Sequence, residues 1–204
     1  NFVYNFNKGI NIIFIIINFL LFVFIIIIVF LNVEFINQIR RFILLFLLRR
    51  KTAVSKNRNP VTIQHAEKIG ILFNAENIKT NDVILEFSKY LKSLQKEVQL
   101  LGYLPKREFG FQYSFPFISE KDTNWYGKPK GGTSSYFINT PFDLTINFCA
   151  DECLPLEYIS GASSSKFRVG FNKEINNANY DLILIPKENK DISNLIQNLE
   201  HYLK

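Results

Sequence analysis

The sequence predicts an α/β domain of Rossmann-like type over residues 69–204, with a mostly parallel sheet, helices on both faces, and an N-terminal apolar and amphipathic helical segment ahead of it. Two observations support this fold class. Short apolar runs of strand length recur along the region, and helical patterns separate them. Strands that alternate with helices are typical of a parallel sheet that is covered on both sides.

Five apolar runs have the length and residue types of buried strands, namely Ile69–Phe73, Val98–Leu104, Phe142–Phe148, Phe167–Phe171 and Leu182–Ile185. A helical stripe between the first two runs consists of Val83, Phe87, Leu91 and Leu94. A C-terminal helix is predicted after Asp191, a suitable N-cap, with Ile192, Leu195, Ile196, Leu199 and Leu203 on one face.

The pattern changes between Pro105 and Pro141. Aromatic residues recur there at period two, which predicts a strand with one aromatic face: Phe109, Phe111, Tyr113, Phe115 and Phe117. Pro116 indicates an edge position or a strand end. A stacking platform for nucleic-acid bases is the alternative, but basic residues are not interleaved, so a half-buried edge strand is favoured.

Residues 1–33 form an apolar segment. No charge interrupts the run from Ile10 to Leu31, which is long enough to span a hydrocarbon core of about 30 Å as a helix. Basic residues follow the run, so the positive-inside tendency would place the domain in the cytoplasm. The alternative is translated upstream sequence, because the chain begins with Asn, contains no Met, and opens with residues of A/T-only codons. The protein would then be cytosolic.

Residues 34–51 are predicted to form a basic amphipathic helix. Apolar residues recur at helical spacing from Phe35 to Leu47, and basic residues lie among and after them: Arg40, Arg41, Arg49, Arg50 and Lys51. One interpretation is a membrane-surface anchor, to which anionic lipid contributes about 1 kcal/mol per basic residue near the surface. The other is a helix that docks on its own domain or on a second copy. Residues 52–68, polar and containing Pro60, are predicted to be a linker.

The net charge of +6 is concentrated ahead of the domain. Residues 1–60 hold eight basic residues and one acidic residue, which leaves a net charge of −1 for the remainder. A nucleic-acid-binding domain normally carries its basic footprint on the fold, so nucleic acid is disfavoured as a partner. The cysteines and histidines indicate neither a disulfide framework nor a metal-ligand set: Cys149, Cys153, His65 and His201. We expect no metal and a reducing cytoplasm.

The long loop that follows the aromatic segment holds the only tryptophan of the chain. Trp125 and Tyr126 offer a large contact area beside charged residues, and long loops in compact domains are often functional. The candidate binding residues of this loop are Asp122, Asn124, Trp125, Tyr126 and Lys128. A protein is one partner that such a surface would suit. The alternative is that Trp125 fills the end of the sheet.

Ligands of open α/β sheets bind beyond the carboxyl ends of the strands. Residues 74–77, after the first strand, carry no glycine fingerprint, which disfavours a nucleotide cradle. Residues 149–153 follow a later strand and open a helix, where Asp151 and Glu152 are candidate binding residues. Helix capping is the alternative role for this acidic pair, and both cysteines are expected to be small packed apolar groups.

Two glycine-containing segments have residues that could bind a phosphate group or cap a helix. Residues 131–135, preceded by Lys128 and Lys130, lack the lysine placement of a P-loop and are predicted to be a flexible loop. Residues 161–166 are predicted to be a helix end with Gly161 in the left-handed cap position.

Several segments together suggest a family: Lys121–Pro129, Phe142–Asn147, Pro155–Ile159, Lys166–Phe171 and Tyr180–Leu184. Over residues 35–204 the chain resembles an uncharacterised family of small proteins from Bacteroidota. That family has no known function, so the resemblance implies no site. Residues 142–171 are also similar to the N-terminal Rossmann half of heptosyltransferase-type glycosyltransferases, which implies a fold more than a catalytic residue.

No nucleophile with its base, metal set or phosphate loop can be assembled from the sequence, so we expect no catalytic residue and no cofactor. The sequence favours a non-catalytic binding or adaptor module at the cytoplasmic face of the membrane. Its partner there would be the membrane or an anionic lipid surface, contacted through the N-terminus. The alternative is a minimal enzyme that handles sugars or nucleotides, which would need a polar pocket with titratable groups at the strand ends.

Overall fold

The computed structural model describes residues 18–24, 29, 32–48, 60–106, 112–150, 153–171, 179–185 and 191–203. The chain divides into two compact units, Asn1–Arg41 and Phe42–Lys204. In the first unit, residues 18–24 and 32–41 are helical, and apolar side chains such as Phe19, Phe22 and Phe35 are exposed. Among the described residues, no helix combines the length and the apolar character needed to cross a membrane.

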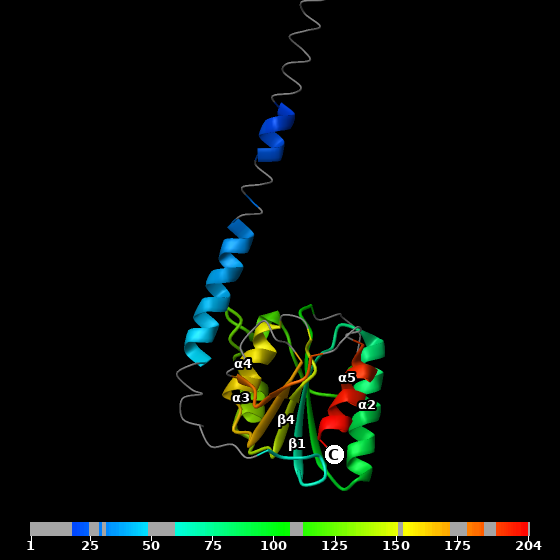
Figure 1. Cartoon of the computed structure of the whole chain (residues 1–204). Coiled ribbons are helices and arrows are strands. Elements are labelled where there is room, and N and C mark those ends of the chain that lie inside the picture. Colours follow the sequence, from blue (N-terminus) through cyan, green and yellow to red (C-terminus); the bar gives the residue numbers. More distant parts are fainter. Residues whose placement is uncertain are drawn as a thin grey trace, which may run out of the picture. The chain divides into compact units, whose positions relative to one another are not determined.

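The second unit is built on a six-stranded sheet with the order β3-β2-β1-β4-β5-β6 (Figure 1). Its strands are β1 (Lys68–Asn74), β2 (Glu97–Tyr103), β3 (Phe117–Ile118), β4 (Leu144–Asn147), β5 (Phe167–Gly170) and β6 (Leu182–Ile183). Each neighbouring pair is parallel. The Rossmann-like α/β fold predicted from the sequence is therefore confirmed.

Helices cover both faces of the sheet: α2 (Ile78–Ser93), α3 (Gly132–Asn139), α4 (Leu154–Ala162) and α5 (Ile192–Tyr202). Figure 1 shows α2 and α5 on one side and α3 and α4 on the other. Alternate residues of β1 serve the two sides, as the period of a strand requires. Ile71 and Phe73 join the core under α2 and α5, whereas Leu72 joins the core under α3 and α4.

Both long helices differ little from their sequence patterns. α5 follows Asp191 as its N-cap and buries Ile192, Leu195 and Leu199, as predicted. α2 buries Phe87 and Leu91 but also Ile84, which the predicted stripe omitted. Leu94 is 44% exposed, because the helix ends at Ser93 and Leu94 is its C-cap.

The aromatic segment forms less strand than its spacing predicted. β3 lies at the edge of the sheet, as Pro116 indicated, but contains only Phe117 and Ile118. Phe115 is buried and packs edge-to-face on Phe73 with ring centroids 4.9 Å apart. Phe109 and Phe111 lie outside the described residues. Phe115 is therefore a core residue, in agreement with the half-buried edge strand that the sequence favours over a stacking platform for bases.

Part of the predicted linker belongs to the folded unit. Ile63 and Ala66 are buried in the core, and the backbone N–H of Ile63 donates to the carbonyl of Leu203 at 2.8 Å. The polar composition of the segment concealed these two apolar contacts. Residues 52–59 lie outside the described residues.

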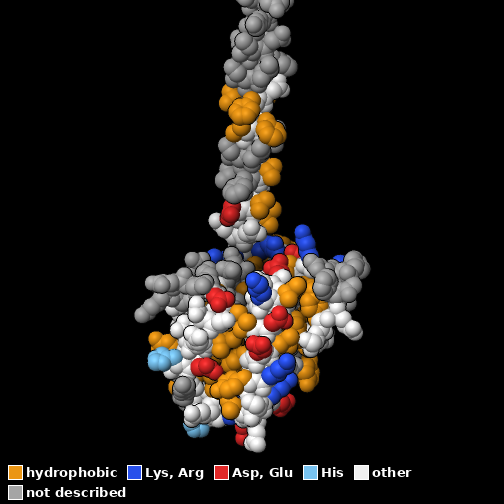
Figure 2. Space-filling model, turned by 90° about the vertical axis from the view of Figure 1, so that its right-hand side faces the viewer, with side chains coloured by type: hydrophobic (Ala, Val, Ile, Leu, Met, Phe, Trp, Pro, Cys, Tyr) orange, Lys and Arg blue, Asp and Glu red, His pale blue; other side chains and the backbone are white. Residues whose placement is uncertain are grey.

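The face that carries α2 and α5 has no single sign of charge. Figure 2 shows Lys, Arg, Asp and Glu interspersed there with hydrophobic side chains. This mixture agrees with the nearly neutral charge of the sequence after residue 60 and offers no basic footprint for nucleic acid on this face.

Candidate functional site

The strand order reverses at the centre of the sheet, and open α/β sheets hold their ligands at such a point. β1 lies between β2 and β4, so the connections that follow β1 and β4 lead to opposite sides. Asn147, the last residue of β4, pairs with Leu72 of β1 and is fully buried. The surroundings of Asn147 are therefore the first place at which to look for a site.

Asn147 is the centre of a buried polar cluster with Glu157 and Tyr180, called here the Asn147 cluster. Its Nδ2 donates to Oε1 of Glu157 at 3.2 Å and to the hydroxyl of Tyr180 at 2.8 Å. Its Oδ1 accepts the backbone N–H of Cys149 at 3.2 Å. Glu157 comes from α4 and Tyr180 precedes β6, so the cluster ties three parts of the chain together.

The environment of the Asn147 cluster disfavours ionisation of Tyr180. Burial of the phenol, followed by the nearby Glu157 carboxyl group, raises the pKa of Tyr180 well above its ordinary value, although the hydrogen bond with Asn147 acts in the opposite direction. Glu157 and Asn147 are fully buried and Tyr180 is nearly so. Among the described residues, the cluster therefore presents no open face to a ligand. Its evident role is to hold α4 against the sheet.

Arg168 extends this polar layer between α4 and β5. It is 2% exposed, and its Nη1 donates to the carbonyl of Gly161 at 2.6 Å and to that of Asn179 at 3.3 Å. The first bond satisfies a carbonyl in the last turn of α4, where helical partners are missing. The buried Nε of Arg168 and Oγ1 of Thr145 have no hydrogen-bond partner among the described residues.

The cysteines are packed groups, as expected. Cys149 and Cys153 are buried, are not joined in a disulfide and belong to the apolar core under α3 and α4. Burial, together with a hydrogen bond to Cys149, raises the pKa of the Cys153 thiol well above its ordinary value. A thiol with a raised pKa is a poor nucleophile at neutral pH. Asp151 and Glu152, the candidate binding pair between them, lie outside the described residues.

The candidate loop is held by its own polar residues. The Asp122 carboxylate accepts the N–H and the hydroxyl of Ser119, both at 2.8 Å. Oδ1 of Asn124 accepts the N–H of Lys128 at 2.9 Å. Two of the five candidate residues, Asp122 and Asn124, thus shape the loop. The structure also contains an antiparallel bridge between Thr123 and Pro129 across it.

Trp125 lies at the exposed end of this loop. Its side chain is 61% exposed and contacts the ring of Tyr126 edge-to-face, with centroids 5.5 Å apart. The alternative prediction, that Trp125 fills the end of the sheet, is wrong, because the loop folds on its own hydrogen bonds and carries the ring outward. Gly127, at φ 86°, supplies the turn that follows.

Lys128 connects the loop to α4. Its Nζ lies 5.7 Å from the centroid of the Tyr158 ring, which is buried. The same Tyr158 belongs to a small apolar cluster with Leu44 and Leu48, both fully buried. Residues 42–48 therefore dock on α4 of their own domain, which is one of the two roles that the sequence suggests for the basic helix.

Gly161 explains how residues 42–48 approach α4. It lies inside the last turn of α4 and not in a left-handed cap, so that prediction is wrong. A Cβ atom at Gly161 would lie 2.9 Å from Cδ2 of Leu48 and 3.0 Å from Cγ of Asn179. The glycine is needed for close packing and not for its backbone freedom.

The other glycine segment is also corrected. Residues 132–139 form α3, and Gly131 at φ 94° is its N-cap, so the predicted flexible loop is an ordered helix start. The hydroxyl of Ser134 is buried and donates to the carbonyls of Lys130 and Gly131, both at 3.2 Å.

The basic residues proposed for the membrane surface are only partly described. Arg40 and Arg41 are half-buried, and residues 49–51 lie outside the described residues. Within the described part of the chain, no group of three or more His, Cys, Asp and Glu is placed to hold a metal ion.

Residues 40–204 match a family described as "Family of unknown function (DUF6913)". The chain belongs to this family. The matched range includes residues 42–48 as well as the whole sheet, so the DUF6913 match covers both the docked segment and the Asn147 cluster. No protein with a curated description matches the chain.

Sequence reasoning missed the polar residues that this DUF6913 domain buries. Asn147 and Arg168 stand within apolar runs that predict buried strands, and Glu157 and Tyr180 lie in segments that carry the family resemblance. A polar residue inside a run of buried strand type was the available signal, because such a residue must find partners across the sheet–helix interface.

Proposed function

We propose that the protein is a non-catalytic binding or adaptor module that residues 34–51 attach to the cytoplasmic face of a membrane. The observation that carries the proposal is that residues 42–48 present apolar side chains on two sides. Leu44 and Leu48 are fully buried, whereas Phe42 is 71% exposed and Phe46 is 49% exposed. Docking on α4 thus accounts for only one of the two apolar faces.

Helix geometry places these faces opposite each other. At about 100° per residue, Phe42 and Phe46 fall on one side of the helix, and Leu44 and Leu48 fall about half a turn away. The same spacing continues through Phe35 and Ile39, which are 62% and 36% exposed. An exposed apolar stripe with several basic residues nearby is typical of a helix that lies in a lipid headgroup layer.

The energies involved are large enough for attachment. Burial of one phenylalanine side chain contributes about 1.5 to 3 kcal/mol, so Phe42 and Phe46 together supply a substantial apolar term. Arg49, Arg50 and Lys51 follow directly in the sequence and add an electrostatic term at an anionic surface. The resemblance to proteins of Bacteroidota would make that surface the bacterial cytoplasmic membrane, and the domain would hold a protein partner beside it.

Flotation with lipid vesicles tests the attachment. A chain that begins at residue 34 should float with vesicles of phosphatidylcholine and phosphatidylglycerol, and a chain that begins at residue 60 should float far less. Phe42→Ser with Phe46→Ser should weaken flotation, and added salt should weaken it further because charges contribute. A matched control is Ile78→Ser with Leu94→Ser, since those side chains are 65% and 44% exposed on α2 and at its end. Equal flotation of the two double variants would refute the proposal.

A second candidate function is an enzyme that handles sugars or nucleotides. It is favoured by the strand order β3-β2-β1-β4-β5-β6, which has a reversal beside Asn147, and by the similarity to a glycosyltransferase Rossmann half. A thermal-shift screen with nucleotides and nucleotide sugars tests it. Stabilisation that depends on ligand concentration and is lost in Asp151→Asn with Glu152→Gln would support the enzyme, whereas no shift with any of these ligands would count against it.

A further inference from the structure

Residues 122–130, called here the Trp125 loop, form a hairpin that is held by hydrogen bonds within the loop. Thr123 and Pro129 form an antiparallel bridge, and the N–H of Asn124 donates to the carbonyl of Lys128 at 3.0 Å. The N–H of Gly127 donates to the carbonyl of Asn124 at 2.9 Å. These bonds hold the loop in shape without any contribution from the indole. Trp125 is therefore presented outward by an ordered support.

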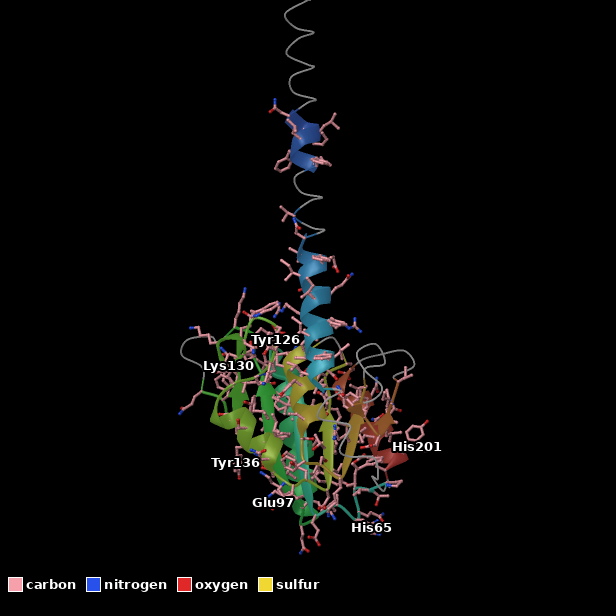
Figure 3. The ribbon with its side chains drawn as sticks, turned by 90° about the vertical axis from the view of Figure 1, so that its left-hand side faces the viewer. His65, Glu97, Tyr126, Lys130, Tyr136 and His201 are labelled. Carbon is pink, nitrogen blue, oxygen red and sulfur yellow. The ribbon has the colours of Figure 1, made fainter. Side chains whose placement is uncertain are left out.

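The Trp125 loop lies next to the docked segment 42–48. The Lys128 ammonium group lies over the Tyr158 ring, and Tyr158 packs with Leu44 and Leu48. A Cβ atom at Gly127 would lie 3.2 Å from Cβ of Leu154, which packs against that small cluster. Figure 3 shows Tyr126 and Lys130 at the same end of the domain as the start of α4. The loop and the proposed membrane-attached helix are therefore neighbours on α4.

The side chains of this loop suit a lipid headgroup layer. Tryptophan and tyrosine combine an apolar ring with a polar group and concentrate at membrane–water interfaces. Trp125 is 61% exposed, and Lys121 and Lys130 flank it with exposed ammonium groups. Residues 120–130 hold three lysines, Lys121, Lys128 and Lys130, against the two acidic residues Glu120 and Asp122. The stretch therefore carries a net charge of +1.

We propose that the Trp125 loop is a second lipid-contacting element, in which Trp125 and Tyr126 enter the headgroup layer and Lys121 and Lys130 contact anionic phosphate groups. The proposal rests on the membrane attachment proposed above and adds a contact from the domain itself. With attachment through both the helix and the loop, the end of the domain that contains Tyr158 faces the lipid.

The single tryptophan makes this proposal directly measurable in the full chain. Its fluorescence reports on Trp125 alone, because the sequence contains no other tryptophan. With vesicles of phosphatidylcholine and phosphatidylglycerol, the emission should shift to shorter wavelength, and lipids with brominated acyl chains should quench it. Lys121→Glu with Lys130→Glu should reduce both effects. Trp125→Ala should weaken vesicle binding by about tenfold, the equivalent of about 1.4 kcal/mol.

Tyr136→Ala is the matched control for loss of an exposed aromatic ring. Tyr136 is 66% exposed on α3, and it interacts electrostatically with Lys68 at the amino end of β1, away from the loop. Its substitution should leave vesicle binding unchanged. Flotation of the full chain without a shift or quenching of Trp125 would overturn the loop contact and leave the helix attachment intact. Absence of flotation would overturn both. A shift that occurs only with an added protein would likewise overturn the lipid assignment.

Discussion

Leu48→Ala tests the docking of residues 42–48 on α4. Leu48 is fully buried, and removal of a buried leucine side chain costs about 2 to 5 kcal/mol where a cavity remains. Docking relies on Leu44 and Leu48, each worth about 1.5 to 3 kcal/mol on burial. Loss of one of them should therefore release the segment before it unfolds the sheet. Amide hydrogen exchange in residues 42–48 should become much faster, while exchange in β1 stays slow.

Phe46→Ala is the control within the same helix. It removes a larger side chain that is 49% exposed, and substitutions at exposed positions usually change stability by less than about 0.5 kcal/mol. Urea unfolding followed by circular dichroism measures both variants. Equal losses of stability and equal exchange rates in Leu48→Ala and Phe46→Ala would refute the assignment of the two helix faces.

Gly161→Ala also tests the packing of Leu48 on α4, because the added methyl group would lie against the Leu48 side chain. The substitution adds helix propensity of about 1 kcal/mol, but the Cβ atom lies 2.9 Å from Cδ2 of Leu48. Overpacking of this kind costs about 1 to 3 kcal/mol. In Leu48→Ala this contact is absent and only the contact with Asn179, 3.0 Å away, remains, so the double variant should be more stable than the sum of the single losses by about 1 kcal/mol. Additive losses would show that the two residues do not share a contact.

The remaining predictions concern stability. Gly170→Ala should destabilise the fold by about 1 to 3 kcal/mol in urea unfolding, because its Cβ would lie 2.7 to 2.8 Å from ring carbons of Tyr180; a neutral result would contradict the packing. Because folding raises the pKa of Tyr180, the neutral phenol contributes its full stabilisation of the folded state below the ordinary pKa of 10.0. This stabilisation is lost as the pH rises through the pKa that Tyr180 has in the folded protein. Tyr180→Phe should therefore make the free energy of unfolding depend less on pH in the alkaline range. Burial alone would raise the pKa of Asp143, but hydrogen bonds from Lys166 and two backbone N–H groups lower it overall. The Asp143 carboxylate therefore stabilises the folded state fully above the pKa that this group has in the unfolded chain, and the stabilisation is lost as the pH falls through its pKa in the folded protein. Asp143→Asn should remove this dependence of the free energy of unfolding on acidic pH. Trp125→Ala should leave the melting temperature unchanged in a thermal scan, because the ring is 61% exposed; a fall of several degrees would contradict its placement.

The strands and helices were largely predictable because they depend on local pattern. Runs such as Ile69–Phe73 are apolar throughout, as strands buried on both faces must be, and the spacing of Leu195 and Leu199 requires a helix. Asp191 was recognisable as an N-cap from its type and place alone. Parallel pairing followed from the alternation of these elements.

The roles of individual glycines and aromatic residues were less predictable, because they depend on contacts between distant segments. Gly161 looked like a helix cap in sequence, yet it is a contact point for Leu48, more than 100 residues earlier in the chain. Trp125 could equally have filled the end of the sheet, and only the hydrogen bonds of its loop decide that it is exposed.

The amphipathic spacing and the charge of the basic helix can be read from its residues alone, but whether its apolar side contacts lipid or protein cannot. The tertiary structure decided that Leu44 and Leu48 pack with Tyr158, while Phe42 stays exposed. It also brought Asn147, Glu157 and Tyr180 together from three separate segments. The spacing of apolar residues predicts which side chains share one face of a helix or strand. Which other element packs on that face depends on contacts between segments that are distant in the sequence.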